Sequence, residues 1–381
     1  MSQLVKFGDV VENLNLTASD TQLNRYERVV GLEHIIPNEL KIQNWDLMAN
    51  LHEGTSFRRI FKKGHVLFGK RRAYQRKVAL ADFDGICSSD ILVFSATKAL
   101  LAGLLPYVVQ SERFFDHANQ TSSGSLSPRT RWQDLAKFTF ELPSLDEQAR
   151  IVELMTAVDE HLDALRSQLE VAKGLRAAVL HQLLSAGGDD WTETILGDVA
   201  EVLDRMRKPI SAAEREKRLG IVPYYGATGQ AGWIDKPIFD EDLVLLGEDA
   251  IDFLNPDVHK AYLISGPSWV NNHAHVLKPR TGKVLPFFLM ESLNAVDYSQ
   301  FVAFGTRSKL TQGSMMGISV NLPPISEQER IVEIVSSMDD VIQAAESAVV
   351  EAKNLRSGLL SDLLSGEHEI PISYDELLGA A

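Results

Sequence analysis

The sequence predicts two globular domains joined by two long helices that pair with each other as an antiparallel coiled coil. The chain has 381 residues, which is too long for one ordinary domain and sufficient for two separate cores. One helical segment occurs twice, starting at Leu142 and again at Leu322, and each copy follows a different globular stretch. The predicted segments are a globular domain at 1–141, a helical repeat at 142–190, a second globular domain at 191–321, a second helical repeat at 322–366 and a C-terminal tail at 367–381.

The two copies of the repeat align without a gap. They are LPSLDEQARIVELMTAVDEHLDALRSQLEVAKGLRAAVLHQLLSA and LPPISEQERIVEIVSSMDDVIQAAESAVVEAKNLRSGLLSDLLSG, and 19 of these 45 positions are identical. The identities include Glu147 with Glu327, Gln148 with Gln328, Arg150 with Arg330, and Leu175-Arg176 with Leu355-Arg356. Agreement at this level indicates an internal duplication.

Each copy is predicted to form one long helix. Proline occurs only near its start, Ala, Leu, Glu, Lys and Arg are frequent, and Gly187 and Gly366 mark the expected ends. Apolar residues recur every seven positions, at Ile151, Val158, Leu165, Ala172 and Val179 in the first copy and at Ile331, Met338, Ala345, Ala352 and Leu359 in the second. This period predicts a seam for a partner helix. The other copy is the expected partner because the intervening domain keeps it at high effective concentration, and the alternative is a coiled coil between two chains.

The formal net charge of -14 argues at first against a nucleic-acid partner, because phosphate binding draws on clustered Lys and Arg. The distribution of the charge changes that conclusion. The two globular segments hold 18 basic against 15 acidic residues and 13 against 16, whereas the first repeat holds 4 against 9 and the second repeat with the tail 3 against 12. The net negative charge therefore lies in the helices and tail, which favours protein partners for those segments.

No run of about 18 apolar residues is present, so the sequence predicts no membrane span, and the N-terminal residues lack the pattern of a secretory signal. We therefore expect a cytoplasmic protein without a membrane partner. The single cysteine, Cys87, cannot form an internal disulfide and is expected to be a small buried apolar residue rather than a nucleophile.

The densest basic segment of the first globular domain is FRRIFKKGHVLFGKRRAYQRK at 57–77, with nine Lys or Arg and no acidic residue. We predict that it contacts DNA phosphates or guanine edges, and the alternative is a solvated basic hairpin. Its candidate DNA-binding residues are Arg58, Arg59, Lys62, Lys63, Lys70, Arg71, Arg72, Tyr74, Arg76 and Lys77. Gly64, Gly69 and Lys70 have the spacing of a nucleotide-binding loop, but Arg71 stands where Ser or Thr is required, so nucleotide binding is not expected.

The second globular domain carries hydrogen-bonding side chains in VPYYGATGQAGWID at 222–235 and WVNNHAHVLKP at 269–279. Its candidate DNA-binding residues are Tyr224, Tyr225, Asn271, Asn272, His273, Arg307 and Lys309. Tyr224, Tyr225 and Trp269 are expected either to pack on sugar or to anchor a loop. His273 and His275 alternate like two metal ligands on one strand, but no neighbouring motif completes a metal site, which favours a structural role.

The sequence lacks the motifs of a self-contained DNA-modifying enzyme. A methyltransferase needs a glycine-rich cofactor loop and an Asn-Pro-Pro-aromatic motif, and the stretch from Asn321 to Ile325 departs from the latter. We therefore predict neither catalytic residues nor a metal site. The alternatives are a methyltransferase or nuclease that acts alone and a coiled-coil scaffold that binds no DNA.

These features resemble the specificity subunit of type I restriction–modification systems, and the resemblance covers nearly the whole chain. Its most specific elements are LPSLDEQARIV and LPPISEQERIV, each leading into a long helix. Further similar segments are GLEHI at 31–35, GKRRAYQRKVALADFDGICSSDI at 69–91, PYYGATG at 223–229, LLGEDA at 245–250 and WVNNHAHVL at 269–277.

The resemblance implies two target-recognition domains of mixed α/β (α+β) structure in a pseudo-two-fold arrangement, each reading half of a split double-stranded DNA site. It implies that the paired helices set the spacing of the half-sites and bind two methyltransferase (modification) subunits, with restriction/translocase subunits joining the complex. S-adenosylmethionine, ATP and Mg²⁺ are then expected on the partner subunits and none on this chain. Base contacts differ among members of the family, so the residues proposed above follow from charge and side-chain chemistry alone.

Overall fold

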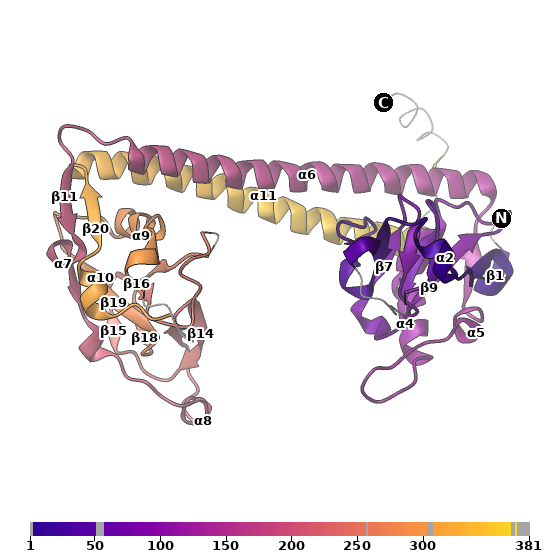
Figure 1. The fold of residues 1–381 in the computed structure, drawn as a ribbon, viewed down its shortest axis with the longest axis horizontal. Helices are drawn as coiled ribbons and strands as arrows, with labels where there is room; N and C mark the ends of the chain where they lie inside the picture. Colours follow the sequence, from indigo (N-terminus) through magenta and orange to yellow (C-terminus); the bar gives the residue numbers. More distant parts are fainter. Residues whose placement is uncertain (1–2, 51–56, 257, 303–307, 367–369, 372–381) are drawn as a thin grey trace. The chain divides into compact units, whose positions relative to one another are not determined.

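The computed structural model describes residues 3–50, 57–256, 258–302, 308–366 and 370–371. The chain divides into two compact units, residues 1–166 with 347–381 and residues 167–346 (Figure 1). Two helices of 41 residues, α6 (Leu145–Ser185) and α11 (Ile325–Ser365), contribute one half to each unit. Among the described residues, no helix has both the length and the apolar character that a membrane span requires.

The globular domain of the first unit contains a two-stranded ribbon and two four-stranded sheets. The ribbon pairs β1 with β10, and the sheets have the strand orders β2-β9-β6-β7 and β4-β3-β8-β5. The strands are β1 (Gln3–Lys6), β2 (Val11–Leu14), β3 (Arg28–Val30), β4 (Asp46–Leu47), β5 (Arg59–Phe61), β6 (Val66–Gly69), β7 (Val78–Leu80), β8 (Gly85–Cys87), β9 (Ile91–Ala96) and β10 (Thr139–Leu142). The helices are α1 (Phe7–Val10), α2 (Asp20–Leu23), α3 (Leu105–Gln110), α4 (Glu112–Gln120) and α5 (Trp132–Leu135).

The globular domain of the second unit repeats this plan. Its ribbon pairs β11 with β20, and its sheets have the strand orders β12-β19-β16-β17 and β14-β13-β18-β15. The strands are β11 (Thr192–Ile195), β12 (Ala200–Val202), β13 (Val222–Gly226), β14 (Gly229–Ile234), β15 (Phe239–Asp240), β16 (Leu243–Gly247), β17 (Ala261–Ile264), β18 (Pro267–Val270), β19 (Ala274–Pro279) and β20 (Ser319–Leu322). The helices are α7 (Leu196–Val199), α8 (Ala212–Arg215), α9 (Pro286–Asn294) and α10 (Gln312–Met316).

The two domains match in strand direction as well as in strand order. β3 and β8 pair in parallel in the first domain, and β13 and β18 do so in the second. All the other strand pairs of both domains are antiparallel within the described residues. The predicted fold class is therefore confirmed. The two domains begin with similar segments, KFGDVVE at 6–12 and ILGDVAE at 195–201, and their structural likeness extends well beyond these segments.

Two buried glutamines attach the starts of the long helices to the domains that precede them. The Gln148 amide donates to the carbonyls of Ala99 and Pro143 and accepts from the Leu101 N–H at 2.8 Å. The Gln328 amide donates to the carbonyls of Lys283 and Pro323 and accepts from the Leu285 N–H at 2.9 Å. Because both side chains are almost fully buried, these bonds fix the angle at which each helix leaves its domain.

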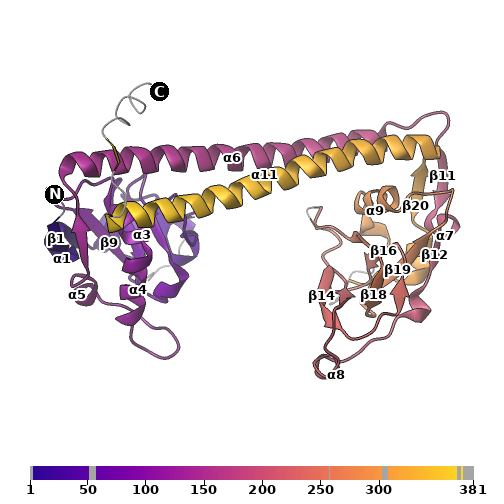
Figure 2. The same ribbon diagram turned by 180° about the vertical axis from the view of Figure 1, so that it is seen from behind.

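Part of the apolar stripe of each helix completes a globular core instead of contacting only the partner helix. In the first unit, Ile151 and Met155 of α6 and Leu360 and Leu363 of α11 belong to the core cluster of the globular domain. The second unit is built in the same way from Ile331 and Val335 of α11, with Leu180 and Leu183 of α6 packed against its core. In each unit the two helix halves lie side by side (Figures 1 and 2). The predicted seam therefore serves two purposes, helix pairing and domain attachment.

The predicted helix ends agree with the structure. α6 ends at Ser185 and α11 at Ser365, and Gly187 and Gly366 follow with φ of 59° and 75°. Glycine adopts this left-handed conformation without the steric cost that other residues incur. Within the second unit, Arg176 contacts Asp339 and Lys173 contacts Glu346 at 2.8 Å, so the helix halves run antiparallel as predicted.

Candidate nucleic-acid interface

The same turn occurs in both domains, between β8 and β9 in the first and between β18 and β19 in the second. In the first turn, the side chain of Ser88 accepts a hydrogen bond from the Asp90 N–H at 3.2 Å. In the second turn, Asn271 Oδ1 accepts from the His273 N–H at 2.8 Å. Asp90 and His273 therefore occupy equivalent positions. In each domain, a second segment hydrogen-bonds to this turn and a third segment hydrogen-bonds to the second.

In the first domain, three segments converge on Asp90. Its carbonyl accepts from the Lys70 N–H at 2.9 Å, and the Lys70 carbonyl accepts from the Thr130 N–H at 3.1 Å. The Asp90 carboxylate pairs with Arg71 at 3.2 Å and with Arg129 at 2.9 Å. We call Lys70, Arg71, Asp90 and Arg129 the first turn site.

In the second domain, the same backbone arrangement carries other side chains. The His273 carbonyl accepts from the Glu248 N–H at 2.8 Å, and the Glu248 carbonyl accepts from the Leu310 N–H at 2.9 Å. Lys309 Nζ pairs with Glu248 at 2.8 Å, and His273 Nδ1 lies 2.5 Å from the Asp249 carboxylate. We call Glu248, Asp249, His273 and Lys309 the second turn site.

The two turn sites differ in charge although their backbones are equivalent. Lys70 and Arg71 in the first site correspond to Glu248 and Asp249 in the second, and Arg129 corresponds to Lys309. The first site therefore offers mainly cationic donors, which suit phosphates and guanine edges. The second offers carboxylate acceptors with one cation and one histidine. The same backbone arrangement thus presents two different hydrogen-bonding surfaces.

Burial and neighbouring charges shift the pKa of several of these groups. Partial burial and the positive charges of Arg59 and Arg129 lower the pKa of Lys70. Burial opposes ionisation of Asp90, but hydrogen bonding to Arg129 and the charge of Arg71 outweigh it and lower the pKa of Asp90. For Glu248, burial is likewise outweighed by hydrogen bonds from Lys309 and Arg207, which lower its pKa. The carboxylates thus stay ionised and hold the cations in place at neutral pH.

A buried ion network lies behind the second turn site. His275, which is 1% exposed, places Nδ1 2.6 Å from Asp204 and Nε2 2.9 Å from the Leu310 carbonyl. Arg207 pairs with Asp204 at 3.1 Å and with Glu248 at 2.6 Å. Because Arg207 supplies the positive charge and both ring nitrogens of His275 face oxygen atoms, the arrangement favours the structural role predicted for His275 over metal binding.

Two other side chains that could bind a metal or react, His34 and Cys87, are also unsuited to either role. His34 lies near Asp46, but its Nδ1 accepts from the Gly31 N–H at 2.9 Å, so the proton of the neutral ring is on Nε2, which faces Asp46. That nitrogen therefore has no free lone pair for a metal. Cys87 is fully buried, and burial raises the pKa of its thiol to about 12. Such a thiol is a poor nucleophile.

The structure divides the predicted basic segment of the first domain into separate groups. Lys70 and Arg71 belong to the first turn site, and Arg59 lies beside them, donating to the Ile91 carbonyl at 3.0 Å and to Asn15. Arg72 donates to the Leu126 carbonyl at 3.3 Å. Tyr74 is exposed.

The remaining basic residues of that segment have other surroundings. Arg58 pairs with Asp20 at 2.6 Å, and the Lys77 ammonium donates to the Leu32 carbonyl at 2.6 Å. Lys62 and Lys63 are exposed in the turn between β5 and β6. This turn is at the opposite end of β6 from Lys70, so the basic segment does not form one continuous surface.

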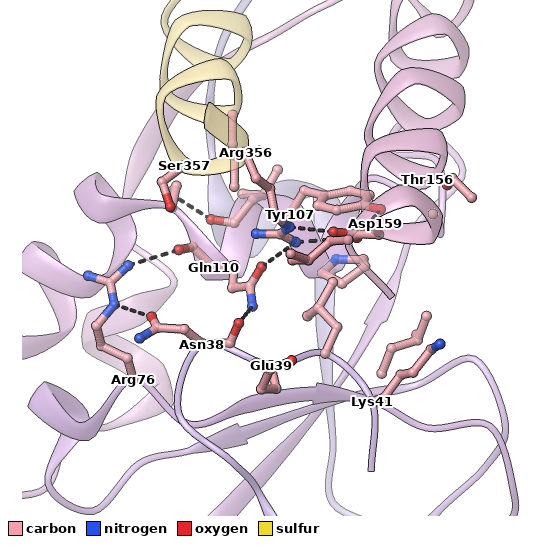
Figure 3. A pocket seen from close by; sticks show the side chains of 18 of the residues that line it. Asn38, Glu39, Lys41, Arg76, Tyr107, Gln110, Thr156, Asp159, Arg356 and Ser357 are labelled. Atoms are coloured by element: carbon pink, nitrogen blue, oxygen red, sulfur yellow. Dashed lines mark hydrogen bonds and ion pairs between the residues drawn. The ribbon is translucent and has the colours of Figure 1, made fainter. Parts of the chain in front are cut away.

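Arg76 lines a different hollow, the helix-side cavity, which has a volume of about 1070 Å³ and is bounded by the first domain and by parts of α6 and α11 (Figure 3). Its guanidinium donates to Asn38 at 2.7 Å, to Glu112 at 2.6 Å and to the Gln110 carbonyl at 3.2 Å, and it lies over the Phe115 ring. These partners engage all three guanidinium nitrogens, which favours a structural role for Arg76 over the predicted DNA contact.

The predicted residues of the second domain also separate. Tyr224 is 3% exposed beneath the guanidinium of Arg215, so it anchors the sheet and has too little free surface for the predicted DNA contact. Trp269 is similarly buried and donates to the Lys208 carbonyl at 2.9 Å. Tyr225 is half-buried against Tyr262.

The other candidates of that domain lie at or beside the second turn site. Asn271 forms the turn and is 9% exposed, whereas Asn272 and His273 are exposed. Lys309 is exposed and paired with Glu248. Arg307 lies outside the described residues.

Asp90 and Arg129 belong to the first turn site although they were not predicted. Arg129 precedes Lys309 by the spacing of 180 residues that separates the two helical repeats. Extending the repeat alignment towards the N-terminus would therefore have identified Arg129 as the counterpart of Lys309. Asp90 is recognised as the counterpart of His273 once the two turns are aligned.

Comparison with known proteins identifies the family. A family model described as the type I restriction modification DNA specificity domain matches the chain twice, over residues 37–172 and 188–352. The chain belongs to this family. The predicted resemblance to type I specificity subunits is thereby confirmed, in agreement with a recognition subunit rather than an enzyme. Each match spans most of one globular domain and much of the helix that follows it.

Two curated relatives carry related descriptions. A Haemophilus influenzae protein described as a type I restriction enzyme specificity subunit is 30% identical over 159 residues, which are 42% of this chain and 40% of that protein. The specificity subunit of the Escherichia coli type I restriction enzyme EcoDI is 29% identical over 148 residues, 36% of this chain and 32% of that subunit. The chain thus matches less than half the length of either relative.

Solved structures share the fold over nearly the full chain. A chain from a study of complex assembly and conformational transition in a type I R-M system has a TM-score of 0.63 at 20% identity and covers 96% of this chain and 98% of its own length. The S subunit of a type I system from M. genitalium has a TM-score of 0.57 at 16% identity, with 96% of each chain covered.

Proposed function

We propose that the chain is the sequence-specific DNA-binding subunit of a type I restriction–modification complex, in which each globular domain reads one half of a bipartite site. The observation that supports this most directly is the pair of turn sites. They present different donors and acceptors from equivalent backbone positions, which is what the reading of two unlike half-sites requires. A scaffold without a DNA partner has no need for such paired and divergent polar surfaces.

The expected partners follow from the family and from the charge distribution. Two methyltransferase subunits would bind along the acidic helices, and restriction/translocase subunits would join them. S-adenosylmethionine, ATP and Mg²⁺ would be held by those partners. In the described part of the chain, the two clusters of histidine with carboxylates, around His34 and around His275, are satisfied internally. A complex that acts on DNA in this way is expected in the cytoplasm.

The experiment compares DNA binding with cofactor binding by the purified full chain. Duplex DNA of random sequence at low salt should bind, and affinity should fall steeply as salt rises because phosphate contacts release counterions. S-adenosylmethionine should not bind, and DNA should remain uncut in the presence of Mg²⁺. Cofactor binding or cleavage by the chain alone would favour a self-contained enzyme, and failure to bind DNA would favour a scaffold.

A further inference from the structure

A second hollow, the basic cavity, adjoins the first turn site and has a volume of about 390 Å³. It is lined by three cationic side chains, Lys70, Arg129 and Arg131, together with the polar residues Ser123 and Thr130. Most of these residues belong to the loop at 121–131, which connects α4 to α5. The loop sequence, TSSGSLSPRTR, contains no acidic residue. The Thr130 hydroxyl is buried 3.0 Å from that of Thr121, so the cavity combines positive charge with the exposed hydroxyl of Ser123.

The cations around this cavity outnumber the acids that neutralise them. Asp90 pairs with Arg71 and Arg129, but Lys70 and Arg131 have no ion pair within the described part of the chain. Burial first, and then the neighbouring charges of Arg59 and Arg129, lower the pKa of Lys70 although the charge of Asp90 opposes them. An anion bound here would relieve that repulsion.

The equivalent place in the second domain shows why the cavity suits an anion. Glu248 and His275 occupy the positions of Lys70 and Leu92, which line the basic cavity. There, Glu248 pairs with the Arg207 guanidinium at 2.6 Å. The second domain thus supplies its own counter-charge at this position. In the first domain the sign is reversed, and among the described residues no carboxylate pairs with Lys70.

The same loop exposes an apolar side chain at its tip. Leu126 is 88% exposed, and Arg72 holds its backbone by donating to the carbonyl at 3.3 Å. The loop after α4 extends from the end of the domain away from α6 (Figures 1 and 2). An exposed leucine in the same loop as the cations of the basic cavity is suited to apolar contact with base edges in a DNA groove.

We propose that the loop at 121–131 is a DNA-reading element, in which the basic cavity receives a backbone phosphate and Leu126 contacts the bases beside it. Arg131 and Lys70 would bind the phosphate directly. Asp90 is a positioning residue, because its ion pairs with Arg71 and Arg129 fix the positions of both guanidinium groups. The inference rests on the proposed function and extends it to residues outside the segment 57–77.

The phosphate arm of the test uses Arg131→Ala in the full chain, with Arg131→Lys to preserve the charge. Lys98→Ala is the matched control, because Lys98 is exposed and follows the opposite end of β9. With random duplex DNA, Arg131→Ala should weaken binding about threefold to tenfold and reduce the slope of log Kd against log salt by about one, and Arg131→Lys should restore most of both. Unfolding curves of each variant verify that the fold is intact.

The base contact is tested by selecting, from a pool of random duplexes, the sequences that the wild type and Leu126→Ser each bind. The selected sequence should lose its preference at one or two adjacent positions, while the salt slope stays unchanged. Leu4→Ser is the control, because Leu4 is a 62% exposed leucine on β1 of the same domain.

The outcomes separate this inference from the proposed function. If the wild-type chain binds DNA while Arg131→Ala matches Lys98→Ala and Leu126→Ser selects the wild-type sequence, the inference is overturned and the proposed function stands. If the wild-type chain binds no DNA, both are overturned.

Discussion

Arg356 of α11 and Asp159 of α6 form an ion pair that attaches both helices to the first globular domain (Figure 3). The Arg356 guanidinium donates to both oxygens of the Asp159 carboxylate and to Gln110 Oε1 at 2.9 Å, and Tyr107 donates its hydroxyl to the same carboxylate at 2.9 Å. In the second unit Arg176 repeats this contact with Asp339 and with Glu291 of α9. The identity of Arg176 with Arg356 in the repeat alignment thus has a structural cause.

Replacing Arg356 by Met should destabilise the first unit, because it leaves the Asp159 carboxylate without its cation in a largely buried setting. Arg356 has 11% and Asp159 28% of the side chain exposed, so we expect a loss of about 1–3 kcal/mol in the free energy of unfolding. Urea unfolding of the full chain measures it. Arg330→Met is the matched control, since its pair with Glu327 is exposed and should matter little. Equal effects of the two substitutions would contradict the structural role of Arg356.

Replacing Gln148 by Leu should destabilise the protein strongly, although the two side chains are similar in size. The change removes both the acceptor for the Leu101 N–H and the donor to two carbonyls, leaving buried backbone groups unpaired at a cost of about 2–4 kcal/mol. Thermal unfolding should show a lower Tm than that of Gln168→Leu, which alters an exposed position of the same helix. Gln328→Leu should behave like Gln148→Leu, and a neutral outcome for both would exclude the proposed attachment.

The ion network behind the second turn site should give the protein a specific acid sensitivity. The folded-state pKa of Glu248 lies below its ordinary value of 4.5, so its stabilising contribution is present above that pH and is lost as pH falls through the folded-state pKa. Wild-type Tm should therefore fall more steeply between about pH 6 and about pH 3 than the Tm of Glu248→Gln. Glu329→Gln, at an exposed position, should follow the wild type. Parallel curves for wild type and Glu248→Gln would show that the network does not stabilise the fold.

The long helices could be predicted from the sequence because their information is local. A period of seven, an absence of internal proline and a terminal glycine placed both ends to within a few residues. The burial of Gln148 could not be predicted in the same way, because its partners lie in the loop at 99–101. The alignment showed the identity of the residue and gave no indication of what it contacts.

The charge of the segment 57–77 was a weaker guide to the site. Arg76 is a basic residue like its neighbours in the segment, but its guanidinium is bonded to Asn38 and to the α3–α4 junction at Gln110 and Glu112, two segments that are distant in sequence. The turn sites depend on the parallel pairing of β3 with β8 and of β13 with β18, and strands of three to five residues carry too little pattern to predict such pairing.

The central claim is that each domain reads its own half of a two-part DNA site. Sequencing of methylated positions in cells that carry the whole restriction–modification system tests it most directly, with the wild type compared with Arg71→Ala in the first turn site and Asn272→Ala beside the second. We predict a wild-type motif of two specified parts separated by an unspecified gap, with each substitution altering one part and leaving the other intact. A continuous motif, or substitutions that both alter the same part, would contradict the account.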